Sequence, residues 1–292
     1  MFKKGSHKWF ALIVIVVGMM TGCNVRHNTK PTIVVSIQPQ KQLLELLVGN
    51  HYDVVCLLSE NTNPETFEPN MNSMIALEQS DAYFTVGNIG YEYAMVQKAR
   101  ANNSDLKLYN TSEGIDVMLG GHGAKVADPH VWTSARNAKI IAGNMLFALC
   151  KLDPDNQDFY KRRYRKLSAH IDSVDNAILA QLAPLQGITF VDWHPSLSYF
   201  ARDYGLNQLS LDNGKEPSAR QLRTMLDVAR KVGAKVFFSQ SQFDSRQSKS
   251  LIEQSGLVTY EINPMNEAWD TELLKISQIL VDNYSSEIEG DD

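Results

Sequence analysis

The chain has few cysteines and few of the motifs that mark common enzymes. Only Cys23, Cys56 and Cys150 occur in 292 residues, and none lies in a metal-type CxxC spacing, which excludes a disulfide framework. We therefore expect Cys56 and Cys150 to be buried free thiols. The sequence also lacks an HExxH helix, a GxSxG nucleophile elbow and an internal repeat of fixed period.

Positive charge is in deficit as well. Lys and Arg number 28 against 33 Asp and Glu, and the formal net charge is −5. The first 22 residues contribute only the basic charges of Lys3, Lys4 and Lys8, so the balance without them is 25 against 33, or −8. Phosphate backbones are bound through clustered Lys and Arg. The acidic balance predicts no such cluster and no nucleic-acid partner.

The amino-terminal region contains an uncharged apolar run over residues 9–20 that follows three lysines and ends at Thr21-Gly22-Cys23. About a dozen residues are too few to cross a hydrocarbon layer, which takes about 20. The pattern predicts a signal peptide over residues 1–22 and a lipidated Cys23, with residues 23–31 as a tether to an extracytoplasmic, periplasmic or cell-surface protein. A soluble secreted protein with an incidental cysteine is the alternative.

The rest of the chain alternates β-branched apolar runs with segments of helical period, which predicts an α/β fold with parallel strands. Strands are predicted near residues 32–37, 53–58, 83–86, 106–109, 188–192, 206–211, 235–239 and 258–262. Helices are predicted near residues 40–48, 71–79, 92–101, 134–150, 197–203, 218–232, 245–254 and 270–284. We expect an amino-terminal lobe over residues 32–153, a helix over 154–185 and a carboxyl-terminal lobe over 186–292.

The segment from Pro154 to about Leu182 contains no internal glycine or proline, and Asp153 with Pro154 forms a good helix start. Its apolar side chains recur every three or four residues, which predicts one apolar stripe on a long helix between the lobes. The stripe consists of Tyr164, Leu167, Ile171, Val174, Ile178 and Leu182. Such a helix would fix the two lobes rigidly.

Two histidines occupy positions that suit metal ligands. His194 follows a predicted strand, where open α/β sheets place ligand-binding groups, and His130 leads into a predicted helix. Each has an aspartate two residues upstream, Asp128 or Asp192, that could accept the second ring N–H.

Other candidates have ordinary explanations. Glu65 and Asp270 follow predicted strands, but Asp270 also suits a helix N-terminus, and Glu65 and Glu68 suit solvated loop charges. We expect ordinary surface or helix roles for His51 and His170, and the role of His122 in a glycine-rich loop stays open.

Four segments in order carry a family resemblance: residues 63–69 (NPETFEP), 128–132 (DPHVW), 193–206 (WHPSLSYFARDYGL) and 216–222 (EPSARQL). With them the chain resembles the metal-binding solute-binding lipoproteins of bacterial zinc/manganese ABC importers, from about Thr32 to Leu280. The resemblance implies two Rossmann-like lobes joined by a long rigid helix, a monomer, and a metal ion held in the cleft between the lobes for delivery to a membrane permease.

The resemblance also implies a metal-ligand set, namely Glu65, His130, His194 and Asp270. Glu65 departs from the family pattern, since relatives usually carry histidine before the aromatic-Glu-Pro that Phe67, Glu68 and Pro69 match. Gln240 stands where relatives often have glutamate, and the loop before DPHVW retains only His122 of a His-rich segment. The residues expected to support the ligands are Asp128, Asp192, Glu68 and Gln240.

Two imidazoles and two carboxylates neutralise a divalent cation and suit Zn²⁺, or Mn²⁺ if the carboxylates bind bidentately. We favour Zn²⁺ because His194 stands where manganese-type relatives tend to carry glutamate. The expected function is transport and not catalysis. The alternatives are a secreted metal-dependent hydrolase using the same residues, which needs an open coordination position, and a surface adhesin, which no apolar patch or repeat in the sequence supports.

Overall fold

The computed structural model describes residues 30–120, 126–212, 217–243 and 249–285. Contacts divide the chain into two units, Met1–Lys30 and Pro31–Asp292, and the sheets and helices described below belong to the second. The predicted signal peptide, Cys23 and His122 lie outside the described residues. Within the described part of the chain, no helix combines the length and the apolar character that a membrane crossing requires.

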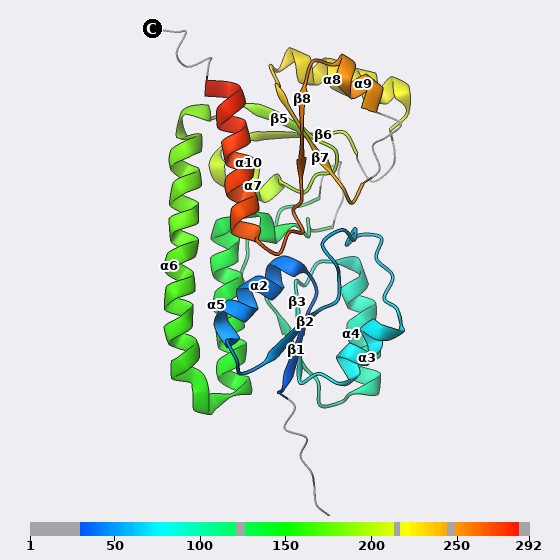
Figure 1. Ribbon diagram of the computed structural model, residues 1–292. Helices are drawn as coiled ribbons and strands as arrows, with labels where there is room; N and C mark the ends of the chain where they lie inside the picture. The colour runs from blue at the N-terminus through cyan, green and yellow to red at the C-terminus, as the bar shows by residue number, and fades with distance from the viewer. Residues whose placement is uncertain (1–29, 121–125, 213–216, 244–248, 286–292) are drawn as a thin grey trace, which may run out of the picture. The chain divides into compact units, whose positions relative to one another are not determined.

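The first lobe is built on a parallel four-stranded sheet with the order β2-β1-β3-β4 (Figure 1). Its strands are β1 (Thr32–Val35), β2 (Asp53–Cys56), β3 (Ala82–Thr85) and β4 (Lys107–Asn110). The helices α2 (Gln38–Val48), α3 (Met71–Glu78) and α4 (Gly90–Asn102) are the crossovers between them. The central strands β1 and β3 are almost fully buried, as their continuous apolar sequence predicts for a sheet covered on both faces.

The second lobe repeats this topology with the order β6-β5-β7-β8. Its strands are β5 (Thr189–Asp192), β6 (Asn207–Ser210), β7 (Val236–Gln240) and β8 (Val258–Ile262). The helices of this lobe are α7 (Ser198–Tyr204), α8 (Ala219–Lys231), α9 (Lys249–Gln254) and α10 (Trp269–Tyr284). In both lobes the strand order reverses beside the first strand, which makes the carboxyl ends of β1 and β5 the expected places for ligand-binding groups.

Two long helices pack side by side at the first lobe, and the second of them continues along the other lobe (Figure 1). A 3-10 turn at Pro154–Asn156 joins α5 (Ala135–Leu152) to α6 (Gln157–Leu182), and a second turn, Ala183–Leu185, ends α6. With 26 residues, α6 is about 39 Å long at 1.5 Å per residue. It buries a stripe that consists of Tyr160, Leu167, Ile171, Val174, Ile178 and Leu182. The expected stripe is confirmed except that Tyr160, and not the half-buried Tyr164, is its fully buried tyrosine.

The stripe on α6 belongs to one apolar core that reaches into both lobes. This core includes Leu43 of the first lobe, Ile171 of α6 and Leu273 of the second lobe. Because the same helix packs against α2, α5 and α10, a change in lobe position has to repack buried side chains. Close-packed side chains resist such movement.

The predicted α/β class, the parallel strands and the inter-lobe helix are confirmed, with most element ends within two residues of expectation. The prediction of free thiols is also confirmed for Cys56 and Cys150. Both are half-buried rather than fully buried. Burial is nevertheless the main cause that raises the pKa of Cys56 to about 12, so this thiol is unreactive at neutral pH.

Replacing Ile178 by Ala should lower the free energy of unfolding by about 2–5 kcal/mol, because the side chain is fully buried on α6 and leaves a cavity. Urea unfolding followed by circular dichroism measures the loss. Ile140→Ala on α5 is the matched control, since Ile140 is 37% exposed, and its loss should stay below about 1 kcal/mol. Equal losses in the two variants would contradict the assignment of α6 as the shared core element.

Candidate metal centre

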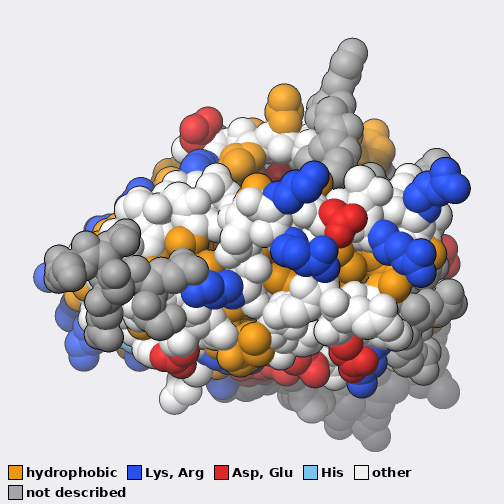
Figure 2. Space-filling model, turned by 90° about the horizontal axis from the view of Figure 1, so that it is seen from above, with side chains coloured by type: hydrophobic (Ala, Val, Ile, Leu, Met, Phe, Trp, Pro, Cys, Tyr) orange, Lys and Arg blue, Asp and Glu red, His pale blue; other side chains and the backbone are white. Residues whose placement is uncertain are grey.

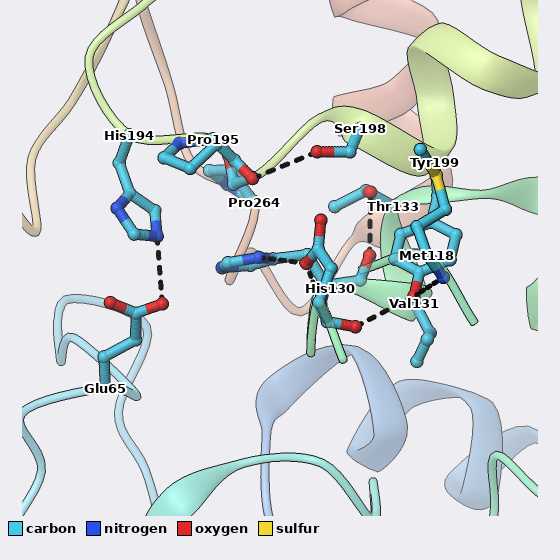
Figure 3. Close-up of polar contacts among 12 residues, drawn as sticks. Glu65, Met118, His130, Val131, Thr133, His194, Pro195, Ser198, Tyr199 and Pro264 are labelled. Atoms are coloured by element: carbon cyan, nitrogen blue, oxygen red, sulfur yellow. Dashed lines mark hydrogen bonds and ion pairs between the residues drawn. The ribbon is translucent and has the colours of Figure 1, made fainter. Parts of the chain in front are cut away.

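Three of the four predicted ligands come together in the structure. Glu65, His130 and His194 each offer one ligand atom, and these atoms all lie within 4.8 Å of one another. Glu65 comes from the loop after β2, His130 from the segment between β4 and α5, and His194 from the loop after β5. Figure 3 shows Glu65 pointing from the first lobe toward His194 of the second. Residues far apart along the chain therefore meet between the two lobes.

His130 is buried and held by its own loop. Its Nδ1 lies 2.8 Å from Asp128 Oδ1, which also accepts the His130 backbone N–H at 2.9 Å. The loop is tied to the second lobe because the Tyr199 hydroxyl donates to the Asp128 carbonyl at 2.8 Å and Trp132 Nε1 donates to the Pro264 carbonyl. The expected contact of Asp128 is confirmed, and it leaves Nε2 of His130 as the atom that can bind a metal.

His194 is equally buried, but its carboxylate partner is not the one expected. Its Nδ1 lies 3.4 Å from Asp212 Oδ2. The prediction that Asp192 fills this role is wrong, because Asp192 is the last residue of β5 and its side chain is fully buried, without a hydrogen-bond partner among the described residues. Asp212 follows the neighbouring strand β6 and reaches the loop through its N–H, which donates to the Trp193 carbonyl at 2.7 Å.

Two further contacts fix the His194 loop. The ring of Phe243 stacks on the imidazole with 4.2 Å between centroids and 16° between planes. The side chain of Gln240 donates from Nε2 to the His194 carbonyl at 3.2 Å and to the Ser196 hydroxyl at 2.7 Å. Gln240 therefore supports the backbone of this loop and does not contact the ring nitrogens.

Glu65 is the exposed member of the group. Its side chain is 42% exposed, against 4% for His194. The loop is shaped by a turn in which Asn63 Oδ1 accepts the Glu65 N–H and by the buried ring of Pro64. Glu65 Oε1 lies 3.3 Å from Nε2 of His194, and the two form an ion pair across the lobes when the imidazole is protonated (Figure 3). Solvent therefore reaches the centre past Glu65.

The carboxylates around His194 set the charge of the centre. Burial opposes the charged form of this imidazole, but the contacts with Asp212 and Glu65 outweigh it and raise the pKa of His194 to about 9. The hydrogen bond to His194 in turn lowers the pKa of Glu65 against the effect of its own burial. At neutral pH the metal-free centre thus holds a proton on His194 and a negative charge on Glu65.

The structure places Asp270 elsewhere. It is the second residue of α10, and its Oδ2 lies 2.7 Å from Nε2 of His170 on α6. Although burial raises the pKa of Asp270, the hydrogen bond from His170 and one from the Thr271 N–H hold it below the ordinary value. A helix N-terminus favours an acidic side chain without any metal, and His170 supplies a partner. Glu68 is exposed in the loop after β2 and is not part of the group.

The donor set suits a divalent transition metal. His194 Nε2 is buried, and the polar atom it faces is Glu65 Oε1 at 3.3 Å, so both atoms already point into the place that a bound ion would take. Two imidazole nitrogens and one carboxylate oxygen match the ligands that Zn²⁺ takes, and a tetrahedral ion bound by these three has one position left. Outer carboxylates on both imidazoles fix the ring orientations, as metal-bound histidines require.

Sequence reasoning missed Asp212 and Phe243. Asp212 directly follows the predicted strand over 206–211, and this position is the one signal in the sequence that could have identified it. The position matters because β6 pairs in parallel with β5, so the carboxyl ends of the two strands lie at the same edge of the sheet. Phe243 carries no polar group, and its stacking on His194 depends on how the loop after β7 folds back. No local pattern in the sequence predicts that contact.

Comparison with known proteins agrees with this geometry. Residues 33–285 match the family described as zinc-uptake complex component A, periplasmic (ZnuA). The chain is 24% identical over 268 residues to the zinc-binding protein AdcA of Streptococcus pyogenes serotype M1, covering 84% of this chain and 52% of AdcA, so it spans about half the length of that relative. It is 23% identical over 228 residues to the manganese ABC transporter substrate-binding lipoprotein PsaA of Streptococcus anginosus, covering 73% of each. A crystal structure of ZnuA superposes with a TM-score of 0.82 at 31% identity, covering 87% of this chain and 99% of that one.

In metal-free protein, His194 should titrate near pH 9, far above an ordinary imidazole. NMR of the ring C–H resonances measures the midpoint. Asp212→Asn removes a contact that raises the pKa, so the midpoint should fall, whereas Asp227→Asn, in an exposed pair with Arg230, should leave it unchanged. Because a metal has to displace the proton, apparent metal affinity should rise about tenfold per pH unit up to about pH 9. A wild-type midpoint near 6.5 would contradict a protonated His194 at neutral pH.

Proposed function

Because the chain belongs to the family of the periplasmic component A of zinc-uptake complexes, we propose that it captures a divalent transition-metal ion outside the cytoplasmic membrane and delivers it to the permease of an ABC importer. The observation that carries the proposal is the meeting of Glu65, His130 and His194 between two lobes. Each imidazole in that group is buried and has a carboxylate beside its second nitrogen.

The arrangement explains how an ion is taken up. A cation first meets Glu65, the exposed donor with a lowered pKa, and then the buried nitrogens of the two histidines. As it binds, the ion replaces the proton of His194, and the net charge of the centre rises by one. The metal therefore joins the first lobe to the second through the same atoms that form the ion pair in its absence.

Release then requires the loop that carries Glu65 to move away from His194 of the second lobe. Contacts beside the centre already join these lobes, since Gln242 Nε2 donates to the Glu60 carbonyl at 2.8 Å and Lys41 Nζ lies 3.0 Å from Glu267 Oε2. These are polar contacts between partly buried side chains, and an ion pair that stays partly exposed to solvent contributes little stability. A permease that binds both lobes can break them, move Glu65 away and free the ion.

Zn²⁺ is the proposed cargo, with Mn²⁺ as the alternative. Two imidazoles with one carboxylate form a nitrogen-rich set, and nitrogen donors favour Zn²⁺ over Mn²⁺, which prefers oxygen. The zinc-binding protein AdcA and the manganese transporter lipoprotein PsaA are about equally similar in sequence to this chain. The donor chemistry of this chain, and not either name, supports the preference.

The membrane attachment of the protein and the boundaries of its lobes are also part of the proposal, and they rest on the sequence. The lipid anchor at Cys23, the signal peptide over residues 1–22, the extracytoplasmic location and the monomeric state follow from the family and from the amino-terminal pattern. The lobe boundaries over 32–153 and 186–292, with the connecting helix over 154–185, follow the same reasoning.

The hydrolase alternative gains no support. An open coordination position is compatible with a metal-bound water, but the family and the named relatives are binding components of transport systems. Glu65 points toward His194 rather than away from the other ligands, so it acts as a donor in this geometry. We therefore propose a binding protein and not an enzyme.

Equilibrium dialysis with metal analysis tests the function. Wild-type protein should bind close to one equivalent of Zn²⁺. Loss of a residue that only supports a ligand weakens metal affinity about 10–100-fold, and His194→Ala, which removes a ligand, should weaken it more. Asp270→Asn is the matched control because its carboxylate contacts His170 instead, and its affinity should stay within a factor of three. A wild-type stoichiometry near zero, or equal losses in the two variants, would contradict the three-residue site.

Replacing Glu65 by His should shift the preference further toward Zn²⁺, because it exchanges an oxygen donor for a nitrogen donor. A competition titration of Zn²⁺ against Mn²⁺ measures the ratio of dissociation constants. Glu68→His places the same imidazole three residues away on an exposed position and should leave the ratio unchanged. An unchanged ratio in Glu65→His would mean that Glu65 does not bind the ion, and tighter Mn²⁺ than Zn²⁺ binding in wild type would overturn the cargo assignment.

A further inference from the structure

The expectation that basic residues are unclustered is wrong for one segment. Residues 161–166 of α6 read KRRYRK, with five cations in six positions. The cluster lies in the amino-terminal half of α6, on a chain whose net charge is −5. A concentration of positive charge on an acidic protein indicates a place where an anion binds.

Part of this cluster lines a groove between α6 and α2, helices that contact one another (Figure 1). The groove has a volume of about 670 Å³, within the range of ligand pockets. Its lining combines cations with apolar surface and consists of Gln42, Leu46, Phe159, Arg162, Arg163, Lys166, Leu167, His170 and Asp270. It lies apart from the metal centre, because none of these residues belongs to the ligand group.

The cations of the groove are available to a ligand. Arg162 and Lys166 are exposed and stand four residues apart on α6, hence on one face of the helix. Arg163 donates from Nε to the Leu46 carbonyl at 2.7 Å and lies over the Phe159 ring, which orients its guanidinium at the wall. Within the described part of the chain, no carboxylate forms an ion pair with these three side chains. The one acidic lining residue, Asp270, is paired with His170.

The apolar part of the lining narrows the ligand class. Leu46 is 41% exposed, and the half-buried Phe159 lies beside the cations on α6. A bare inorganic anion uses only the charged wall, whereas a phosphate that carries a hydrocarbon chain uses both. Arginine binds phosphate oxygens through several N–H donors, and the apolar surface shields the chain from water.

The position of the groove indicates the source of such a ligand. Phe159 in the groove packs against the ring of His51, with 4.5 Å between the ring centroids. Asp53, which follows His51 by two residues, donates its N–H to the carbonyl of Pro31. The groove thus lies close to the point where the second unit begins. Pro31 follows Cys23 by eight positions, and an extended chain of eight residues spans at most about 28 Å. If Cys23 carries the lipid anchor proposed above, the groove is kept near the phospholipid headgroups.

We infer that the groove between α2 and α6 binds the headgroup of an anionic phospholipid, with its phosphate on Arg162, Arg163 and Lys166 and its apolar chain on Leu46 and Phe159. The choice of a membrane lipid over a free anion rests on the proposed attachment through Cys23. Metal binding does not enter the inference, so the two proposals fail separately.

Isothermal titration calorimetry with monomeric dihexanoyl phosphatidylglycerol tests the site on the full chain bearing Cys23→Ser, so that no acyl chain is attached. One lipid should bind per chain, and Arg162→Gln with Lys166→Gln should weaken binding at least tenfold. The charge-matched control is Arg220→Gln with Arg223→Gln on α8, whose side chains are exposed. Other Lys and Arg side chains are scattered over the surface, as the face seen in Figure 2 shows. This control should bind lipid within twofold of wild type. Both double variants should still bind Zn²⁺ as the parent does, which shows that they are folded.

Further titrations separate the possible ligands. Phe159→Ala should weaken the lipid but leave inorganic phosphate unchanged, and dihexanoyl phosphatidylcholine should bind more weakly than the anionic lipid. The inference is overturned if the anionic lipid does not bind at millimolar concentration, or if the Arg162/Lys166 variant binds it as wild type does. It is also overturned if inorganic phosphate alone binds as tightly as the lipid, which would mark a free-anion site. Tighter binding of hexaglutamate would instead mark a site for an acidic protein segment and overturn the inference as well.

Discussion

The ion pair between Glu65 and His194 is the interaction on which the centre depends. It joins the loop after β2 to the loop after β5, and it requires the charge on His194 that Asp212 and Glu65 stabilise against burial. In the metal-free protein a proton occupies the place of a cation between these groups. A divalent ion that displaces the proton finds donors that are already in position, so binding needs little reorganisation of the fold.

The fold supplies this position through two repeated sheets and one rigid connection. Each sheet reverses its strand order beside its first strand, and the carboxyl ends of the strands carry the loops that hold the ligands. The helix α6 packs its apolar stripe into a core shared by both lobes. Large rotations of the lobes are therefore unfavourable, and small shifts of the loop that carries Glu65 are the easier way to admit or release an ion.

The sequence predicts much of this architecture and part of the site. Periodicity identified the strands and helices, because parallel strands buried on both faces read as short apolar runs. Position after a strand identified His194, and position before a helix identified His130. Position after a strand failed for Asp192. Asp270 lies at the helix N-terminus that the sequence also indicated, and it does not join the ligand group that the resemblance implied. The direction of a side chain at a strand end and the partner across a helix interface depend on tertiary packing. Asp212 and Phe243 reach His194 from strands that are neighbours only in the folded sheet.

X-ray absorption fine structure on the zinc-loaded protein tests the central claim most directly, because it reports the atoms bound to the ion. A site formed by Glu65, His130 and His194 predicts a shell of nitrogen and oxygen atoms at about 2.0–2.2 Å that includes two imidazoles, with one imidazole lost in His130→Ala and one in His194→Ala. A shell without imidazole, a sulfur ligand, or a shell that stays the same in both variants would contradict it.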